Sequence, residues 1–309
     1  MPEPTILVTG STGFLGSHLM KALGGSAVNL IGVSSAEADL TNAAACDALF
    51  AETRPAYVIN LAAKSGGIQS NRTQPADYFR ENILILTNVY ASACKVGVVN
   101  MITPMGGCSY PATARSPISE DQMWLGYPQI ESAGYSLAKK MALVLADAYR
   151  TQEGLQSAVV VPGNMYGEFD NFNLEHSHVL PAMIRKFCLA TDDVVTFWGS
   201  GAPKRDFVYA GDVAEIISKL IFDDNFTGPI NISSGTETSI RELAGKVAAA
   251  SGFEGQILWD DSYPDGQMVK IFDTSLMREH GLACNTDLDY GIDKTIRWFK
   301  ESYPTGVRL

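Results

Sequence analysis

Tyr135 and Lys139 are two chemically active residues that lie four positions apart, in a run that opens an expected helix ending near Tyr149. Residues at i and i+4 share one face of a helix, so the phenol and the ammonium lie side by side. A neighbouring ammonium favours the phenolate, which predicts a tyrosine pKa below its ordinary value near ~10. Such a pair suits proton transfer at the oxygen of a carbonyl or an alcohol. A surface Tyr/Lys pair is the alternative interpretation, and the surrounding motifs favour the catalytic one.

Cys108 and His178 are the other candidate catalytic residues. Cys108 lies in the loop Thr103–Pro111, directly after the expected strand Val98–Ile102. In parallel sheets, ligands bind beyond the carboxyl ends of the strands, where this loop lies. A histidine titrates near neutrality, so His178 is a candidate general acid, with a solvated loop histidine as the alternative.

Three glycines at spacing three, Gly10, Gly13 and Gly16, join the short apolar strand Ile6–Thr9 to an apolar helix ending near Leu23. Gly10 permits a tight turn, Gly13 lets backbone N–H groups approach a pyrophosphate, and Gly16 lets the helix pack closely on the strand. The helix N-terminus adds partial positive charge. Strand, glycines and helix in this order predict a dinucleotide-binding site.

The end of the second expected strand, Val28–Val33, is where such proteins select their cofactor. An acid there binds the ribose of NAD, and an arginine binds the 2′-phosphate of NADP. Ser34 and Ser35 provide neither, so the sequence predicts NADP or NAD with weak discrimination. Asp39, followed by Leu40, either borders the adenine or begins the next helix, and the sequence does not favour one of these interpretations.

Strands and helices alternate along the first half of the chain. After the strand Tyr57–Leu61 comes a polar loop, Lys64–Thr73, and then a long helix, Pro75–Cys94, with an expected apolar face. The residues of that face are Phe79, Ile83, Leu86, Val89 and Tyr90. A further strand spans Ser157–Val161, and the alternation predicts an α/β fold with a doubly wound parallel sheet, the Rossmann fold.

The later chain is expected to form a smaller C-terminal α/β substrate lobe. We expect a dinucleotide-binding domain over residues 1–165, to which residues 206–232 return, and a mainly substrate-binding lobe over residues 166–309. Expected helices there are Val213–Phe222, Ile240–Ser251 and Leu288–Phe299, and Lys270 lies in a short strand-like run.

Composition argues against a nucleic-acid-binding protein, a membrane-spanning protein and a cysteine metal site. The 309 residues carry a net charge of −11, which argues against nucleic-acid binding and requires local cations for any anionic ligand. No apolar run approaches the ~18 residues of a membrane span. The cysteines are odd in number and lack C-x-x-C spacing, which predicts reduced thiols, a cytoplasmic location and no metal site. They are Cys46, Cys94, Cys108, Cys188 and Cys284.

Together these motifs resemble the extended short-chain dehydrogenase/reductase family, and within it the GDP-L-fucose synthases, over nearly the whole chain. The segments that carry the resemblance are Gly10–Gly16, Ala63–Ile68, Cys108–Pro111, Tyr135–Lys139, Asn164–Gly167, Asp170–Phe172, Ser177–Val179 and Trp198–Arg205. It implies an NADPH-dependent epimerase/reductase acting on a GDP-linked 4-keto sugar. It also implies a homodimer paired through the helices Pro75–Cys94 and Tyr135–Tyr149.

The resemblance also implies roles for individual residues. Tyr135 protonates the C4 oxygen as hydride arrives, Lys139 holds the nicotinamide ribose, and Cys108 and His178 epimerise the carbons beside the keto group. The expected cofactor contacts are Gly10, Thr12, Gly13, Phe14, Leu15, Gly16, Asp39, Leu40, Leu61, Ala62, Ala63, Tyr135, Lys139, Pro162, Asn164 and Met165. The implied substrate contacts are Cys108, Asn164, Val179, Lys186, Trp198, Arg205 and Lys270.

The chain departs from the family pattern at two places. Gly106 stands where the family has a catalytic serine or threonine, and the arginines that bind the 2′-phosphate are absent. The leading hypothesis is therefore a nucleotide-sugar epimerase/reductase in which epimerisation dominates. The alternatives are an NAD-retaining nucleotide-sugar 4-epimerase or dehydratase, and a non-catalytic protein that senses a dinucleotide.

Overall fold

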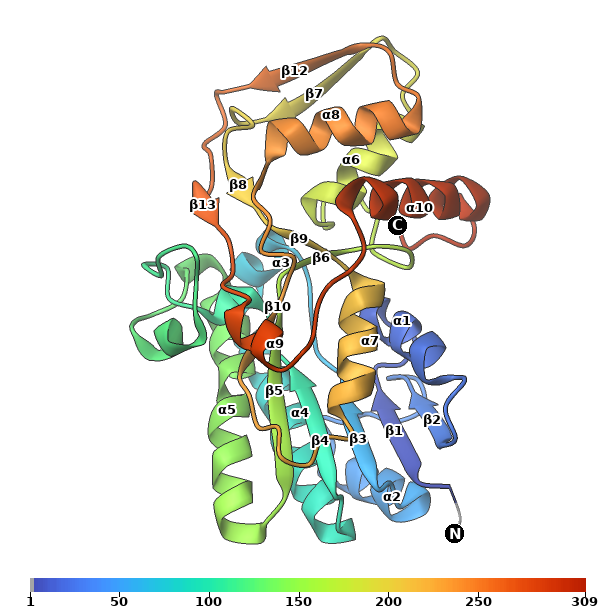
Figure 1. The fold of residues 1–309 in the computed structure, drawn as a ribbon, viewed down its shortest axis with the longest axis vertical. Helices are drawn as coiled ribbons and strands as arrows, with labels where there is room; N and C mark the ends of the chain where they lie inside the picture. Colours follow the sequence, from blue (N-terminus) through green and yellow to red (C-terminus); the bar gives the residue numbers. More distant parts are fainter. Residues whose placement is uncertain (1–2) are drawn as a thin grey trace.

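The computed structural model describes residues 3–309, and its centre is a six-stranded parallel sheet (Figure 1). The strand order is β10-β5-β4-β3-β1-β2. The strands are β1 (Thr5–Thr9), β2 (Asn29–Val33), β3 (Tyr57–Asn60), β4 (Asn100–Pro104), β5 (Gln156–Pro162) and β10 (Ile230–Ile232). The order reverses at β1, so the carboxyl ends of β1 and β3 form the switch point where such sheets bind ligands. The predicted doubly wound fold is confirmed.

Helices cover both faces of this sheet, and each face has its own hydrophobic core. One face packs against α2 (Ala43–Thr53), α4 (Pro75–Val96) and α5 (Ala133–Glu153). The other packs against α1 (Phe14–Leu23), α7 (Ala210–Leu220) and the short α9 (Ser275–Glu279). The apolar residues in the middle of β1, β3, β4 and β5 have 0% exposure, because apolar helices cover the sheet on both sides.

A smaller lobe lies above the carboxyl ends of the strands (Figure 1). Its helices are α6 (Val179–Cys188), α8 (Ile240–Ser251) and α10 (Leu288–Ser302). Its strands form the pairs β7 (Val194–Trp198) with β12 (Gln256–Asp260) and β6 (Asn164–Tyr166) with β9 (Phe207–Tyr209). A third group joins β8 (Lys204–Arg205), β11 (Thr238–Ser239) and β13 (Val269–Lys270).

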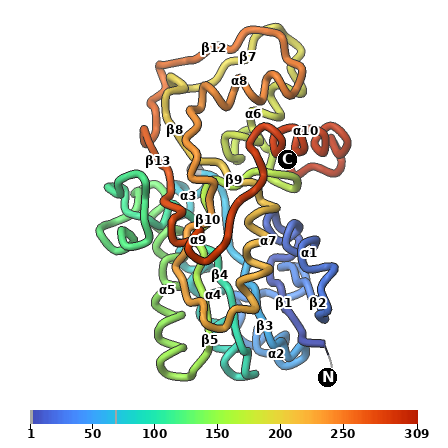
Figure 2. The backbone as a smooth tube through the Cα atoms, viewed as in Figure 1, coloured from blue at the N-terminus to red at the C-terminus, as the bar shows by residue number. Residues whose placement is uncertain are grey.

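The chain passes between the sheet and the lobe several times (Figure 2). Strand β10 pairs with β5 at the edge of the sheet, and α7 packs against α1. After β13 the chain returns once more, and α9 lies beside β10. These crossings place residues from both ends of the sequence around the same sheet edge.

Some local expectations differ from the structure. The expected loop Lys64–Thr73 contains a helix, α3 (Ile68–Thr73), and the strands β7, β11 and β12 were not anticipated. Phe79 was expected on the buried face of α4 but is 43% exposed, whereas its neighbour Tyr78 is buried. The cause is Tyr78, whose hydroxyl packs closely on Gly66 in the loop before α3, so that the neighbouring Phe79 faces outward.

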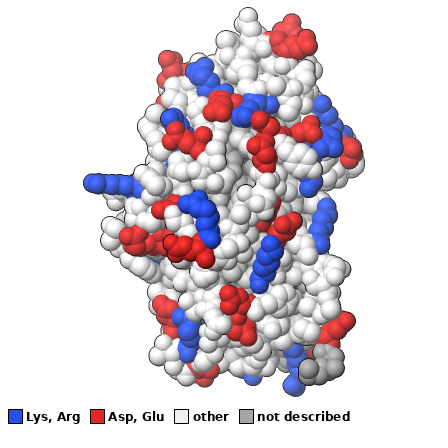
Figure 3. Space-filling view, in the orientation of Figure 1, with Lys and Arg blue, Asp and Glu red and all other residues white. Residues whose placement is uncertain are grey.

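The chain between β4 and α5 forms three turns of 3-10 helix, η1 (Gly107–Ser109), η2 (Glu120–Trp124) and η3 (Ile130–Ser132). No helix in residues 3–309 is long and apolar enough to span a membrane. Acidic and basic side chains are interspersed on the face shown in Figure 3, where no continuous basic stripe is visible.

Candidate active site

The glycine loop folds as a phosphate site requires. Gly10 has φ +68°, and a Cβ there would lie 3.0 Å from the backbone of Leu61 and Ala62 at the end of β3. A Cβ on Gly16 would lie 2.3 Å from the carbonyl oxygen of Gly10, so the helix approaches its own loop closely. The expected partner of Gly16 was the strand, and the structure places it against the loop backbone instead.

Helix α1 presents an uncapped N-terminus at this loop. Its N-cap is Gly13, and no side chain accepts a hydrogen bond from the first turn. The orphan N–H groups of such a terminus bind anions, and no side chain competes with a phosphate here. Thr12 is exposed at the rim, Phe14 is half-buried and Leu15 is buried in the core. The site fits a dinucleotide pyrophosphate.

The end of β2 contains a carboxylate that sequence reasoning missed. Glu37 accepts hydrogen bonds from the backbone nitrogen of Ser34 at 2.7 Å and from its hydroxyl at 2.8 Å, which lower the pKa of the Glu37 carboxyl. Asp39 accepts from the backbone and hydroxyl of Thr41, and Asn42 caps α2. Asp39 therefore does not begin the helix, and it is exposed in the loop between β2 and α2.

The remaining expected cofactor contacts lie at the carboxyl ends of neighbouring strands. Leu61, Ala62 and Ala63 follow β3 and are half-buried, and Leu40 is buried beneath the β2–α2 loop. Pro162 ends β5, and Asn164 donates from its amide to the carbonyl of Asp206 at 2.8 Å. Met165 is half-buried against the sheet core.

Tyr135 and Lys139 lie on the first turns of α5, where Cys108 of η1 faces them. Lys139 is only 4% exposed, and burial lowers its pKa to about 8, opposed by the charge of Cys108. Within residues 3–309, neither the Tyr135 hydroxyl nor the Lys139 ammonium has a hydrogen-bond partner. A buried ammonium is costly unless it is paired, so this position is built to meet a polar ligand.

The predicted fall in the tyrosine pKa is wrong for this structure. Burial raises the pKa of Tyr135 above its ordinary value, and the charges of Cys108 and Tyr78 raise it further. Desolvation disfavours the phenolate, and it outweighs the attraction of an ammonium that is itself poorly solvated. Tyr135 is therefore held as a neutral phenol, the form that donates a proton.

Gly106 lies directly beside this group. A Cβ on Gly106 would lie 3.1 Å from Sγ of Cys108 and 3.8 Å from the Tyr135 hydroxyl oxygen. The neighbouring hydroxyl, Ser109, is buried and donates to the carbonyl of Ser136 at 3.1 Å. Ser109 is thus committed elsewhere and does not replace the hydroxyl that Gly106 lacks.

His178 is the N-cap residue of α6. It is exposed, and its charge lowers the pKa of the buried Asp170, which desolvation nevertheless raises to about 6. In the part of the chain that the structure describes, His178 and Cys108 are not in direct contact. The backbone of His176 closely approaches Gly67, so the His178 loop borders the glycine pair that precedes α3.

Two cations that are far apart in sequence meet at the substrate side. Lys270 of β13 is directly opposite Arg205 of β8 in a parallel pair. Burial lowers the pKa of both groups, while the charges of Cys108 and Asp206 raise that of Lys270. Asp206 is fully buried, accepts from the backbone nitrogen of Phe272 at 3.0 Å, and has a pKa raised by burial to about 6.

Three further expected substrate residues are more remote. Lys186 donates to the carbonyl of Thr196 at 3.0 Å, and burial lowers its pKa. Val179 is 37% exposed at the start of α6. Trp198 is 71% exposed and stacks on Tyr263, with ring centroids 4.6 Å apart and an interplanar angle of 11°.

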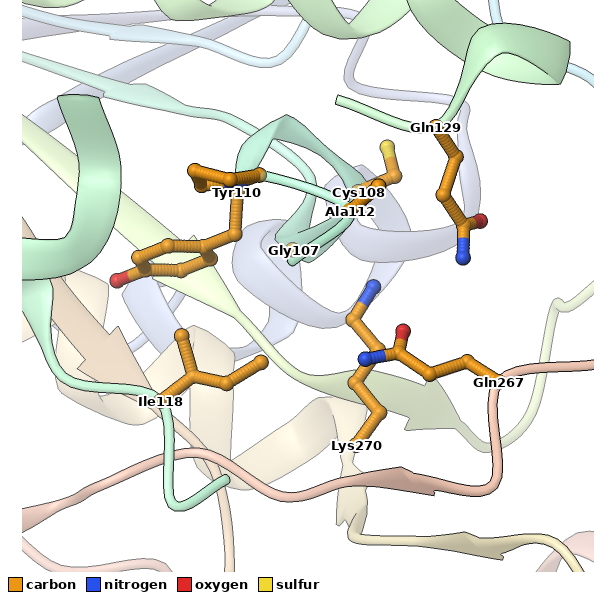
Figure 4. A pocket seen from close by; sticks show the side chains of 9 residues that line it. Gly107, Cys108, Tyr110, Ala112, Ile118, Gln129, Gln267 and Lys270 are labelled. Carbon is orange, nitrogen blue, oxygen red and sulfur yellow. The ribbon is translucent and has the colours of Figure 1, made fainter. Parts of the chain in front are cut away.

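A small pocket joins the two groups of residues (Figure 4). Cys108 and Lys270 line it, together with Gln129 and Gln267, which sequence reasoning missed. It also missed Glu37, Asp206 and Tyr263. The only available signals were an acid four residues after β2 and an acid directly after Arg205, since single glutamines and tyrosines in loops carry no pattern.

Comparison with known proteins agrees with this geometry. Residues 6–232 match the NAD dependent epimerase/dehydratase family. The chain is 37% identical over 300 residues to GDP-L-fucose synthase 1 of Arabidopsis thaliana, covering 95% of this chain and 92% of the relative. The crystal structure of a GDP-L-fucose synthetase from Naegleria fowleri bound to NADP has a TM-score of 0.92 and 30% identity, covering 100% of this chain and 96% of the other.

A second solved structure is similar over its whole length. It is a GDP-D-glycero-L-gluco-heptose synthase from Campylobacter jejuni in the presence of NADPH, with a TM-score of 0.88 and 26% identity, covering 97% of this chain and 99% of the other. The resemblance to the extended short-chain dehydrogenases/reductases is confirmed, and the chain belongs to the NAD dependent epimerase/dehydratase family.

Proposed function

We propose that this chain is a nucleotide-sugar epimerase/reductase that acts on a GDP-linked 4-keto sugar and in which epimerisation dominates. The observation that carries the proposal is the position of Cys108. It adjoins Gly106 and Tyr135, since a Cβ on Gly106 would lie 3.1 Å from its Sγ and 3.8 Å from the Tyr135 hydroxyl oxygen, and it shares a pocket with Lys270. The relatives are GDP-L-fucose synthases and a GDP-heptose synthase, which supports a GDP-linked substrate.

The nicotinamide dinucleotide, when bound, exchanges a hydride with C4 of the sugar. This chain supplies the rest of the site. The glycine loop and the N-terminus of α1 would hold the pyrophosphate, and the buried Lys139 ammonium would donate to the nicotinamide ribose. The Tyr135 hydroxyl donates its proton to the C4 oxygen, a role that its raised pKa suits.

Epimerisation needs a base and an acid on opposite faces of the sugar. The C4 ketone acidifies the protons on the two flanking carbons, and the Cys108 thiolate accepts such a proton. We assign to His178, the N-cap residue of α6, the donation of a proton to the other face. Each exchange inverts one carbon and leaves the numbers of atoms and electrons in the sugar unchanged.

Basic side chains give the acidic protein a local site for an anionic substrate. We assign the diphosphate to Arg205 and Lys270, with Lys186 turning from the Thr196 carbonyl to join them. We assign Asn164 and Val179 to the sugar and the exposed ring of Trp198 to the base.

The competing hypothesis is an NAD-retaining 4-epimerase or dehydratase, which Gly106 and the absent arginines favour. Denaturing the purified protein and identifying the released cofactor by mass spectrometry separates the two. We expect no stoichiometric NAD, and rapid proton exchange on GDP-4-keto-6-deoxy-mannose. One equivalent of tightly bound NAD, with no exchange on the keto sugar, supports the alternative.

Cofactor selectivity is expected to be weak. No lysine or arginine occurs in residues 9–18 or 34–42, and the ionised Glu37 holds Ser34 at the place where a 2′-phosphate needs a cation. A charged hydrogen bond is worth about 1.5–3 kcal/mol, so its loss removes most of the preference for NADP(H). Fluorescence titrations with NADPH and NADH should give affinities within about a hundredfold, and a larger ratio contradicts this account.

We also expect a homodimer built from α4 and α5. These helices span 22 and 21 residues and pack against each other, yet Phe79 and Val144 on them remain 43% and 49% exposed. A second copy would cover these apolar side chains. Light scattering at micromolar concentration should give twice the monomer mass of 33.3 kDa, and a monomer there refutes the expectation.

A further inference from the structure

Two glutamines line the small pocket beside Cys108. Gln129 precedes η3, and Gln267 lies three residues before Lys270 on the chain that leads into β13. Figure 4 shows the Gln267 amide beside the Lys270 side chain and the Gln129 amide on the other side of the pocket, while Sγ of Cys108 points away from both amides. Residues far apart in the sequence thus bring two amides to one small pocket that Cys108 also lines.

Neither amide is used by the protein itself. Gln129 and Gln267 are half-buried, and within residues 3–309 neither side chain has a hydrogen-bond partner. Other glutamines do have one: Gln122 donates to the carbonyl of Arg115 at 3.0 Å, and Gln152 donates to Glu153 at 2.8 Å. Half-buried amides without partners are available to a ligand.

The backbone fixes both glutamines in place. The nitrogen of Lys204 donates to the carbonyl of Met268 at 2.7 Å, which anchors the residue after Gln267 to β8. The nitrogen of Ser132 donates to the carbonyl of Gln129 at 3.1 Å. The amides therefore sit on anchored backbone on two sides of one pocket.

Residues 263–270 run past three of the expected substrate-binding surfaces in turn. Tyr263 stacks on Trp198, a Cβ on Gly266 would lie 3.7 Å from Nη2 of Arg205, and Gln267 reaches the pocket of Cys108. The sequence of surfaces is aromatic, then cationic, then uncharged and polar. This matches a base, a diphosphate and a sugar, in the order in which a nucleotide sugar presents them.

We propose that Gln129 and Gln267 are specificity-determining residues that bind hydroxyl groups of the substrate's hexose. An amide both donates and accepts, as a hydroxyl does, and it adds no charge beside Lys270. An amide that hydrogen-bonds to a hydroxyl discriminates strongly between sugars, because a sugar that lacks the hydroxyl leaves the amide unpaired. The assignment rests on the proposed function, since it places a sugar beside Cys108.

The test compares binding of GDP with that of GDP-mannose by calorimetry, in the presence of NADPH. Gln129→Met and Gln267→Met keep the side-chain length and volume but remove the hydrogen bonds. Each should weaken GDP-mannose binding about tenfold while leaving GDP binding unchanged, because GDP carries no sugar. Gln152→Met, a surface glutamine at the end of α5, is the matched control and should change neither affinity.

The outcomes distinguish failure of the proposed function from failure of the role assigned to the two glutamines. If wild type binds neither GDP nor GDP-mannose, the proposed function fails together with this inference. If wild type binds both, but the ratio of the two affinities is the same in wild type and in the two variants, the inference alone fails. A loss confined to GDP-mannose supports the amide pair, whereas an equal loss for both ligands assigns the glutamines to the diphosphate and overturns it.

Discussion

Gly106→Ser is expected to accelerate hydride transfer to the 4-keto sugar by about 10²–10³ in a single turnover, equivalent to roughly 2.7–4 kcal/mol. The reason is the missing donor. In the proposed mechanism Tyr135 is the hydroxyl donor to the C4 oxygen, and Ser109 does not assist it because its buried hydroxyl donates to the carbonyl of Ser136. A serine hydroxyl at position 106 adds the second, preorganised donor.

The structure has room for this serine. Gly106 has φ −77° and ψ 148°, a conformation that any residue adopts, and a Cβ there would lie 3.5 Å from the Tyr135 ring. Sγ of Cys108, at 3.1 Å, must move by a few tenths of an ångström. Gly106→Ala is the control, since it adds the Cβ without the hydroxyl and should not accelerate the transfer.

Proton exchange should be unchanged in Gly106→Ser, because it depends on Cys108 and His178. Stopped-flow measurement of NADPH oxidation gives the hydride step, and deuterium uptake gives the exchange step. If wild type already reduces its keto sugar rapidly, and the serine does nothing or slows it, then Gly106 makes room for a different substrate.

Cys108→Ser is expected to abolish exchange of the sugar protons beside the keto group. A positioned general base contributes typically about 10²–10⁴ in rate, and a serine hydroxyl is far too weak an acid to act as an anion in its place. Cofactor binding should be preserved, since the glycine loop and Lys139 are untouched. Mass spectrometry of the sugar after incubation in deuterium oxide measures the exchange.

Cys94→Ser is the matched control for this variant. Cys94 lies on α4, outside the site, and is a half-buried free cysteine like Cys108. It should exchange at the wild-type rate. Deuterium uptake that persists undiminished in Cys108→Ser shows that another residue is the base, and the mechanism proposed for epimerisation is then wrong.

The sheet and its glycine loop were predictable because short-range patterns determine them. Buried parallel strands are nearly continuous apolar runs, and the turn at Gly10 admits only a residue that tolerates φ +68°. The lobe was harder to predict. Strand β7 pairs with β12 about sixty residues later, and a short half-exposed strand carries little apolar pattern of its own.

In the site, too, the features set by local sequence were predictable and those set by distant contacts were not. The spacing of Tyr135 and Lys139 placed them correctly on one helix, but their pKa shifts depend on burial, which neighbouring elements impose. Arg205 and Lys270 lie opposite each other because β8 and β13 pair over two residues, and no local sequence pattern predicts that pairing. Glu37 went unnoticed because its side chain folds back on Ser34, a contact that depends on the turn rather than on spacing alone.

Deuterium uptake by GDP-4-keto-6-deoxy-mannose, measured on the wild-type protein without added NADPH, tests the central claim most directly. Cys108 and His178 should exchange the protons on both carbons flanking the ketone, and on addition of NADPH this exchange should remain faster than reduction. Bound GDP-sugar that takes up no deuterium at either carbon would contradict the assignment of this chain as a keto-sugar epimerase.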